Sequence, residues 1–210
     1  MAELQLFGMP QSTFTWTARI ALAEKGAKYT HVPLPPHRPE VSAIHPFGKI
    51  PVLCDNDFSL YETRAICGYI DRVCPGPSLM PSDPRLAAKT EQWVSLIATT
   101  LDPVMIRNYV LAYVFPGTPD GKPDRSRIDA NLPALRKQLE LLEKSLVDGH
   151  LVGGQFTLAD AYLFPIVYYL TKMPESGPII AASPGISAFF AKNSARPSVR
   201  QSAPPPMPAG

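Results

Sequence analysis

The pattern of apolar and polar positions predicts alternating strands and helices at the start of the chain. Leu4 and Leu6 share one face of a short strand that ends at Met9-Pro10. Residues 15–25 then place apolar side chains on one face of a helix, and Gly26 just past them is a typical helix C-terminal signal. Residues 29–34 predict a second strand, which the prolines that follow interrupt.

A hairpin and a third helix complete this first unit. The apolar runs at 52–54 and 58–60 flank an Asp-Asn-Asp triplet, which favours a tight turn between two strands. Residues 62–73 predict a helix. The order is therefore βαβ followed by ββα, within residues 1–76.

Beyond a linker at 77–85, which is rich in Pro, Gly and Ser, only helical periodicity is found. Leucines at 132, 135, 139, 142 and 146 form one stripe of a helix. Thr157 stands three residues before Asp160, the spacing of a capping box. We therefore expect an all-helical domain at 86–200, followed by a disordered Pro-rich tail at 201–210. The predicted helices of this domain cover residues 86–115, the leucine stripe, 157–170 and 184–193.

Composition narrows the possible functions. Apolar residues make up 45% of the chain and charged residues 18%, which is typical of a globular protein with a large core. The net charge is +2 and Lys and Arg are scattered, so the sequence argues against a nucleic-acid partner. It contains neither a signal peptide nor an apolar run of about 20 residues. We expect a cytoplasmic protein without a membrane partner.

Metal and disulfide chemistry are not predicted. The three cysteines at 54, 67 and 74 form no C-x-x-C pair. The four histidines at 31, 37, 45 and 150 are too far apart in the sequence to indicate a zinc site. We therefore expect no metal and no cofactor.

Three short segments carry candidate chemistry, and each also has a purely structural explanation. Residues 8–13 place the hydroxyls of Ser12 and Thr13 between a strand and a helix N-terminus, where an anion is favoured, although either hydroxyl would also serve as an N-cap. Pro51, directly before a strand, would in the cis form leave the Ile50 backbone free to bind a ligand. Glu62 and Thr63 either cap the third helix or present a carboxylate, a hydroxyl and an amide to a zwitterion.

In combination and order these segments resemble the cytosolic glutathione transferases, with the serine-type phi and theta-like bacterial branches as the nearest match. The similarity extends through Thr157-Leu158-Ala159-Asp160-Ala161 to Ala195-Arg196-Pro197-Ser198-Val199, so it spans nearly the whole chain. It implies a thioredoxin-like domain followed by a helical bundle. It also implies glutathione as co-substrate, nucleophilic addition or substitution by its thiolate on a small hydrophobic electrophile, and a two-fold homodimer.

The resemblance also assigns roles to residues of the first domain. Ser12 matches the hydroxyl that hydrogen-bonds the glutathione sulfur, with Thr13 as its nearest rival. Pro51 matches the family's cis-proline, and Ile50 the residue whose backbone pairs with the cysteinyl unit. The remaining assignments are Glu62 and Thr63 for the γ-glutamyl end, and Lys49 with His37 or Arg38 for the glycyl carboxylate.

The second substrate is expected against the helix at 86–115, where Met105, Arg107, Tyr109 and Tyr113 are candidate contacts; core packing or a dimer surface would equally explain them. Two other functions stay open. One is a glutathione-dependent peroxidase on the same fold. Reductase branches of the family carry a cysteine at the position of Ser12, so its absence here argues against disulfide exchange but not against peroxide reduction. The other is a non-catalytic glutathione- or ligand-binding module.

Overall fold

The computed structural model describes residues 4–206 and divides into two units. The first unit contains the chain up to Pro81 together with the segment that begins at Ala195, and the second contains Ser82–Ser194. The boundary after Pro81 falls inside the expected linker. The return of the C-terminal segment to the first unit differs from the expected division, which assigned residues up to 200 to the helical domain.

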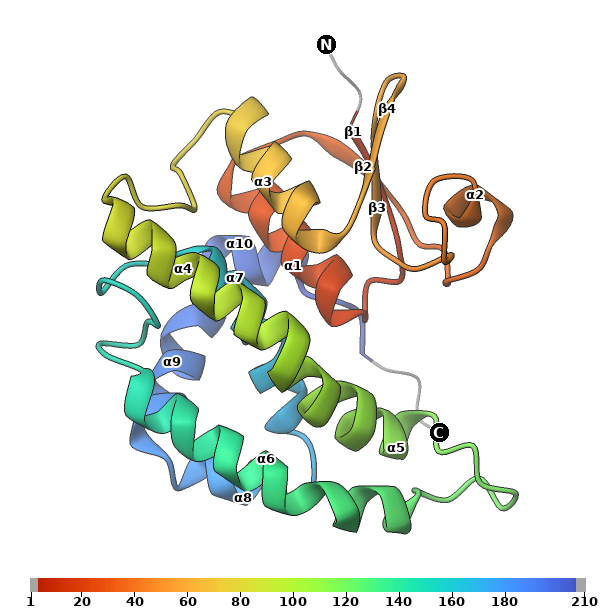
Figure 1. The fold of residues 1–210 in the computed structure, drawn as a ribbon, viewed down its shortest axis with the longest axis vertical. Helices are drawn as coiled ribbons and strands as arrows, with labels where there is room; N and C mark the ends of the chain where they lie inside the picture. Colours follow the sequence, from red (N-terminus) through yellow and green to blue (C-terminus); the bar gives the residue numbers. More distant parts are fainter. Residues whose placement is uncertain (1–3, 207–210) are drawn as a thin grey trace. The chain divides into compact units, whose positions relative to one another are not determined.

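A four-stranded sheet forms the centre of the first unit, with strand order β2-β1-β3-β4 (Figure 1). The strands are β1 (Leu4–Phe7), β2 (Tyr29–Val32), β3 (Val52–Asp55) and β4 (Phe58–Tyr61). β1 is parallel to β2 and antiparallel to β3, and β3 and β4 form the predicted hairpin. β2 is two residues shorter than expected, because the residue after Val32 is a proline, which lacks the N–H that a strand ladder uses.

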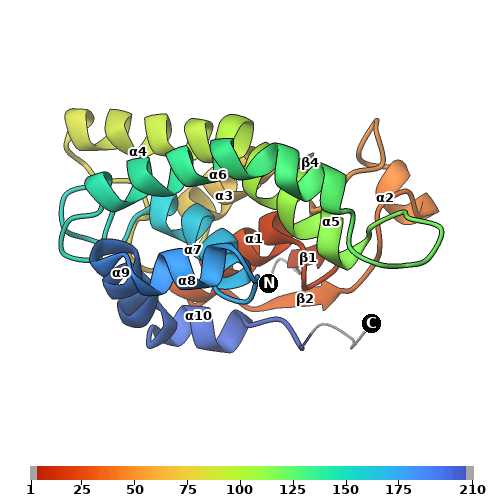
Figure 2. The same ribbon diagram turned by 90° about the horizontal axis from the view of Figure 1, so that it is seen from below.

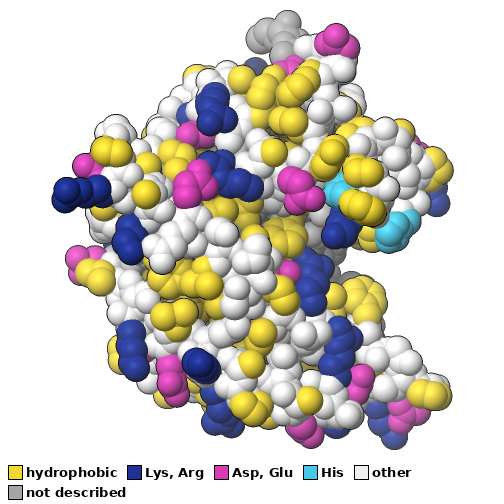
Figure 3. Space-filling view, in the orientation of Figure 1, with side chains coloured by type: hydrophobic (Ala, Val, Ile, Leu, Met, Phe, Trp, Pro, Cys, Tyr) yellow, Lys and Arg dark blue, Asp and Glu magenta, His cyan; other side chains and the backbone are white. Residues whose placement is uncertain are grey.

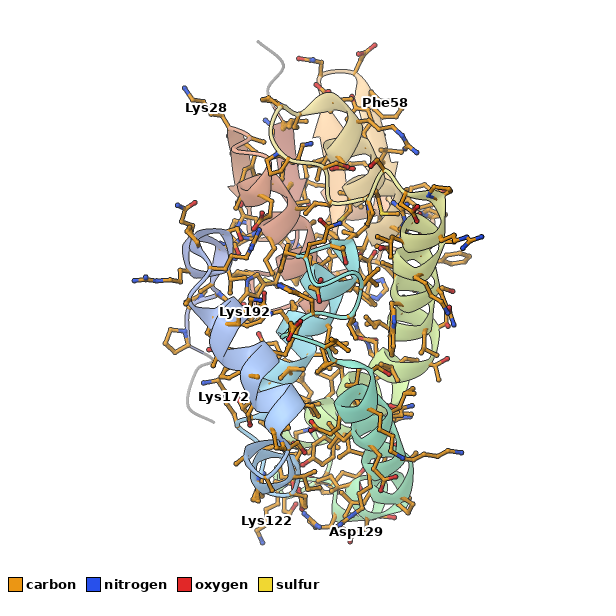
Figure 4. The ribbon with its side chains drawn as sticks, turned by 90° about the vertical axis from the view of Figure 1, so that its left-hand side faces the viewer. Lys28, Phe58, Lys122, Asp129, Lys172 and Lys192 are labelled. Carbon is orange, nitrogen blue, oxygen red and sulfur yellow. The ribbon has the colours of Figure 1, made fainter. Side chains whose placement is uncertain are left out.

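Helices α1 (Thr13–Glu24) and α3 (Thr63–Val73) pack against each other on one face of this sheet, and the short α2 (Pro39–Ser42) lies on its other side (Figure 1). α1 begins two residues earlier than predicted because Ser12 caps it. On α3, the ring of Tyr69 packs 5.1 Å from that of Phe58, the first residue of β4, which is labelled in Figure 4. This contact joins the hairpin to the helical layer.

The C-terminal segment is held on α1 by a helix that the sequence pattern did not predict, α10 (Pro197–Ser202). The indole of Trp16, 1% exposed, donates to Ser202 Oγ at 3.0 Å. Arg196 binds the carboxylate of Glu24 through two nitrogens at 2.5 and 2.8 Å. Gln201 and Ser202 are therefore helical, against the prediction of a disordered tail, and residues 207–210 of that tail lie outside the described residues.

The second unit consists of helices, with α7 at its centre (Figure 2). All but one of the residues of α7 are buried, in agreement with its apolar sequence. The predicted capping box is confirmed, since the Thr157 amide donates to Asp160 Oδ2 at 2.8 Å. The helices are α4 (Pro84–Leu96), η1 (Ile97–Leu101), η2 (Pro103–Val110), α5 (Leu111–Val114), α6 (Arg125–Ser145), α7 (Leu158–Leu170), α8 (Ser176–Ala181) and α9 (Pro184–Ser194).

The single helix expected at 86–115 is formed, but its hydrogen-bond pattern changes along its length from α-helical to π-helical and back. Its middle part, η1 and η2, is wound as a π-helix, with Asp102 between the two segments. Pro103 has no N–H to donate to the preceding turn, which favours such a change of winding. Side chains of α6 bind backbone carbonyls of this stretch: Asn131 donates to Val104 O at 2.7 Å and Gln138 to Thr100 O at 3.1 Å.

Candidate active site

The strand register brings the three candidate segments to one end of the sheet. Phe7 of β1 is paired with Val52 of β3, and Val52 is paired in turn with Tyr61 of β4. The end of β1, the start of β3 and the end of β4 therefore lie side by side, with neighbouring strands about 4.8 Å apart. Ser12, Pro51 and Glu62 lie a few residues beyond this row.

Ser12 is the N-cap of α1, which confirms the structural part of its prediction. Its Oγ accepts a hydrogen bond from the amide of Thr15 at 3.4 Å. A hydroxyl that accepts in this way keeps its own proton for donation. α1 has no acidic residue in its first turn, so its positive end is not neutralised locally. Thr13 is only 4% exposed, whereas Ser12 is half-buried, which favours Ser12 as the group that meets a ligand.

The segment before β3 has the expected cis peptide bond between Ile50 and Pro51. Ile50 lies beyond Val52, the last residue of the described ladders on this side, so it stands at the end of the sheet and not within it. Gly8 packs against this segment: a Cβ added there would lie 3.4 Å from Ile50 Cβ and only 2.5 Å from Thr15 Oγ1. Residue 8 must therefore be glycine for α1 and Ile50 to approach the end of β1 as they do.

Glu62 and Thr63 begin α3 without the side-chain cap that was one explanation for them. The backbone of Glu62 lies in the left-handed region, with φ 68°, and its side chain makes no cap hydrogen bond. Non-glycine residues in this region are uncommon and gather at functional sites. Its side chain is 68% exposed, with Oε1 3.5 Å from Nε2 of His45. The carboxylate is thus free to bind a cation at its outer side.

The cationic candidates lie together in the loop around α2. The amide of His37 donates to the carbonyl of Gly48 at 2.8 Å, which places His37 beside Lys49. His37, Arg38 and Lys49 are exposed. In Figure 3 histidine side chains (cyan) and hydrophobic side chains (yellow) gather on the same part of the surface, beside α2. Arg38 and Lys49 carry the positive charge that binding of a glycyl carboxylate requires, and that binding stays a prediction.

The four residues predicted for the second substrate have different positions within the helical unit. Met105 and Tyr109 are 0% exposed, so neither can contact a ligand in this conformation. Arg107 Nε lies 2.8 Å from Asp102 Oδ2, and the half-buried Tyr113 donates to Glu175 Oε2 at 2.5 Å. The sequence could not separate these residues, because helical spacing alone does not tell core from ligand-facing side chains.

Glu175 is the centre of a charged cluster that sequence reasoning missed. Its carboxylate accepts from Tyr109, Tyr113 and Arg125. Burial by itself raises the pKa of Glu175, but the hydrogen bonds from Tyr113, Arg125 and Tyr109 outweigh it and lower the pKa to about 2. The cluster ties α5 and the start of α6 to the α7–α8 loop. Tyr113 therefore has its hydroxyl proton engaged by Glu175.

Two histidines of the first unit also support the site and were not singled out from the sequence. His31 Nε2 lies 2.8 Å from the carbonyl of Gly8, at the start of the Ser12 loop. His45, 3% exposed, accepts from the Phe47 amide and faces Glu62. The sequence contained no signal for either role, because a lone histidine in a loop is compatible with many environments.

Comparison with known proteins agrees with this fold. The family model "Glutathione S-transferase, N-terminal domain" matches residues 6–78, and "Glutathione S-transferase, C-terminal domain" matches residues 102–197. The chain belongs to the glutathione S-transferase family, as the sequence motifs predicted, and it is an enzyme of that family.

Its relatives include plant and bacterial proteins. It is 32% identical over 209 residues to glutathione S-transferase 3 of Zea mays, covering 96% of this chain and 93% of the relative. The crystal structure of glutathione transferase F7 from Populus trichocarpa superposes with a TM-score of 0.85 at 30% identity, covering 95% of this chain and 97% of the other. A glutathione S-transferase from Methylobacillus flagellatus with glutathione bound superposes with a TM-score of 0.81 at 26% identity, covering 97% and 100% of the two chains.

Among residues 4–206, every helix is too short or too polar to span a membrane.

Proposed function

We propose that this transferase stabilises the thiolate of glutathione through a hydrogen bond from Ser12, and that the thiolate attacks a hydrophobic electrophile by addition or by substitution of a leaving group. The observation that carries the proposal is the place of Ser12. It caps α1 at the end of β1, on the same row of the sheet from which Ile50, Pro51 and Glu62 project. A thiol held beside Ser12 would meet a hydroxyl proton and the positive end of a helix together.

The energies are sufficient without a general base. An ordinary cysteine thiol has a pKa of about 8.5, and lowering it to about 6.5 requires about 2.7 kcal/mol of preference for the thiolate. A hydrogen bond to a charged group contributes about 1.5–3 kcal/mol. The helix N-terminus adds about 0.3–1 kcal/mol. Serine acts here as a hydrogen-bond donor to sulfur and not as a nucleophile.

The rest of glutathione would be bound along the same edge of the sheet. We assign the cysteinyl backbone to Ile50 at the cis-Pro51 turn. The γ-glutamyl ammonium and carboxylate are assigned to the exposed Glu62 carboxylate and to Thr63 at the N-terminus of α3. The glycyl carboxylate is assigned to Lys49 with His37, which the His37–Gly48 hydrogen bond brings together. Each assignment places opposite charges, or donor and acceptor, against each other.

As contacts for the electrophilic substrate we retain Arg107 and Tyr113, because Met105 and Tyr109 have no exposed surface. Phe115, which follows α5 and is 72% exposed, adds an apolar side chain near Tyr113 in the sequence. These residues favour an apolar electrophile. The homodimer that the resemblance implies stays a prediction.

The test is a titration of enzyme-bound glutathione thiolate by its ultraviolet absorbance. We expect a thiol pKa well below that of free glutathione in the wild type, and loss of that lowering in Ser12→Ala. Ser12→Ala also removes the N-cap, which costs about 0.5–2 kcal/mol of stability. Ser12→Asp is the matched control, since it keeps a cap acceptor but opposes a thiolate, so it should fold stably and raise the thiol pKa.

Three outcomes decide between the alternatives. An unchanged thiol pKa in Ser12→Ala together with a raised one in Thr13→Ala would transfer the role to Thr13. An ordinary thiol pKa in the wild type would refute thiolate activation altogether. Turnover of cumene hydroperoxide well above turnover of an aryl halide would favour the peroxidase reaction over transfer.

A further inference from the structure

His45 is a buried histidine whose two ring nitrogens face different parts of the first unit. It lies in the loop between α2 and β3 and is 3% exposed. Its Nδ1 lies 3.0 Å from the backbone nitrogen of Phe47. A backbone N–H can only donate, so Nδ1 must be the acceptor and the proton of the neutral ring is on Nε2. The hydrogen bond from the Phe47 amide therefore decides which ring nitrogen of His45 carries the proton.

That nitrogen lies close to Glu62. Nε2 lies 3.5 Å from Glu62 Oε1 and is the nitrogen that carries the N–H. The two residues belong to different segments, the loop before β3 and the turn from β4 into α3. A pair of this kind fixes one carboxylate oxygen and leaves the other free.

The ring of His45 also holds the backbone that leads to Glu62. Its centroid lies 4.8 Å from the ring of Tyr61, the residue before Glu62, and 6.2 Å from the ring of Phe47. Glu62 itself has φ 68°, a conformation that the surrounding structure must maintain. An exposed glutamate otherwise samples many rotamers, and fixing one of them costs free energy when a ligand binds. Contacts made before binding reduce that cost.

We propose that His45 is a positioning residue for the γ-glutamyl end of glutathione. Its Nε2–H, 3.5 Å from Glu62 Oε1, attracts that oxygen electrostatically, so that the other oxygen of the carboxylate faces the ammonium group of the ligand. The inference rests on the proposed binding of that ammonium by Glu62 and adds to it the group that orients the carboxylate. His45 does not touch the sulfur or the electrophile.

Two substitutions at position 45 separate positioning from packing. In His45→Asn the side-chain oxygen can reach the position of Nδ1 and accept from Phe47, but no group extends to Glu62. In His45→Gln the amide nitrogen can reach the position of Nε2 and donate to Glu62, but the acceptor for Phe47 is lost. Each variant therefore retains one of the two contacts of His45: the hydrogen bond from Phe47 or the polar contact with Glu62.

We expect His45→Asn to raise the KM for glutathione about 3- to 10-fold, the effect of losing one polar contact to a carboxylate, with kcat at saturating glutathione within about twofold of wild type. His45→Gln should return the KM most of the way to the wild-type value. The opposite order, with Asn like wild type and Gln impaired, would show that His45 only maintains the loop and would overturn the inference. Equal KM values in all three proteins would also overturn it.

A ligand analogue makes the test specific for the ammonium. Glutathione that lacks the α-amino group has no cation for Glu62 to bind, so His45→Asn should change its KM by less than about twofold. An effect of equal size on glutathione and on the analogue would contradict the positioning role. In a Glu62→Gln background, His45→Asn should have no further effect on the KM for glutathione.

The same measurements separate this inference from the proposed function. If Glu62→Gln raises the KM for glutathione but His45→Asn does not, the assignment of Glu62 stands and the role of His45 fails. If Glu62→Gln leaves the KM unchanged, the γ-glutamyl assignment itself is wrong. Thermal melting of each variant identifies any loss that comes from unfolding.

Discussion

Asp160 offers the sharpest test of how this structure is held together. Its side chain is 0% exposed and binds two segments of the helical unit. Oδ2 accepts from the Thr157 amide at 2.8 Å and from the Thr157 hydroxyl at 3.1 Å. Oδ1 accepts from the Leu151 amide at 2.9 Å, nine residues earlier in the chain. The residue is therefore both a helix cap and a link to the loop before α7.

The expected cost of Asp160→Ala follows from these bonds. Loss of an ordinary N-terminal cap costs about 0.5–2 kcal/mol. Here the substitution also leaves two buried amides, those of Leu151 and Thr157, without an acceptor, and each buried unsatisfied donor costs about 1–3 kcal/mol. We expect the free energy of unfolding to fall by about 3–5 kcal/mol, a large share of the about 5–15 kcal/mol typical of a folded protein.

Urea unfolding followed by tryptophan fluorescence measures this loss of unfolding free energy for the helical unit alone. The two tryptophans of the chain lie in different units, Trp16 in the first and Trp93 in the second. Fluorescence of Trp93 in a Trp16→Phe background therefore reports on the helical unit that contains Asp160. Thr157→Ala, which removes the hydroxyl and keeps the amide, is the matched control and should cost about 1 kcal/mol.

A loss below about 1 kcal/mol in Asp160→Ala would refute the reasoning, because it would mean that the Leu151 amide does not depend on this carboxylate. A loss of turnover in protein that remains fully folded would also contradict it, since it would give Asp160 a role in the reaction.

Two further predictions concern the first unit. Burial alone raises the pKa of Glu24, but the hydrogen bonds from Arg196 and Ser198 outweigh it, so the folded pKa lies below the ordinary 4.5. The ionised Glu24 therefore stabilises the folded state fully above pH 4.5, and this contribution is lost as the pH falls through the folded pKa. The free energy of unfolding, measured between neutral and acidic pH, should fall with pH in wild type and fall less steeply in Glu24→Gln. If the unfolding free energies of both proteins had the same slope against pH, Arg196 and Ser198 would not stabilise the ionised Glu24 carboxylate. Gly8→Ala should lower stability by about 1–2 kcal/mol and raise the KM for glutathione, because Gly8 has φ 151° and its Cβ would lie 2.5 Å from Thr15 Oγ1. Adding Thr15→Ala should restore part of both losses, and no restoration would disprove that contact.

The parts of the fold that depend on neighbouring residues could be predicted from the sequence. The alternation around Leu4 and Leu6 marked a strand. Four of the five leucines of the predicted stripe are buried, at 135, 139 and 142 in α6 and at its C-cap 146, whereas Leu132 is only half-buried. The capping box of α7 was visible because its two partners are three residues apart. Family motifs identified the protein's class and the segments of its candidate site.

Other features depended on residues far apart in the chain. The contact of Trp16 with Ser202 joins residues 186 positions apart, and it places the C-terminal segment in the first unit. The burial of Met105 and Tyr109 could not be distinguished from a ligand-facing position, because one helical face can cover a core or a binding site. The π-winding of η1 and η2 is supported by side chains of α6 that are reached only through tertiary packing.

The sequence by itself determined the strands, the longer helices and the capping box of α7, since period, turn residues and capping pairs act over a few residues; it did not indicate α10 or the π-helical segments. Only the tertiary structure decided which of them meet. The register of Phe7, Val52 and Tyr61 aligns three segments at one end of the sheet, and the α2 loop then brings His45 to Glu62. The physical reason is that long-range pairing depends on the summed packing of remote elements, which no local pattern encodes.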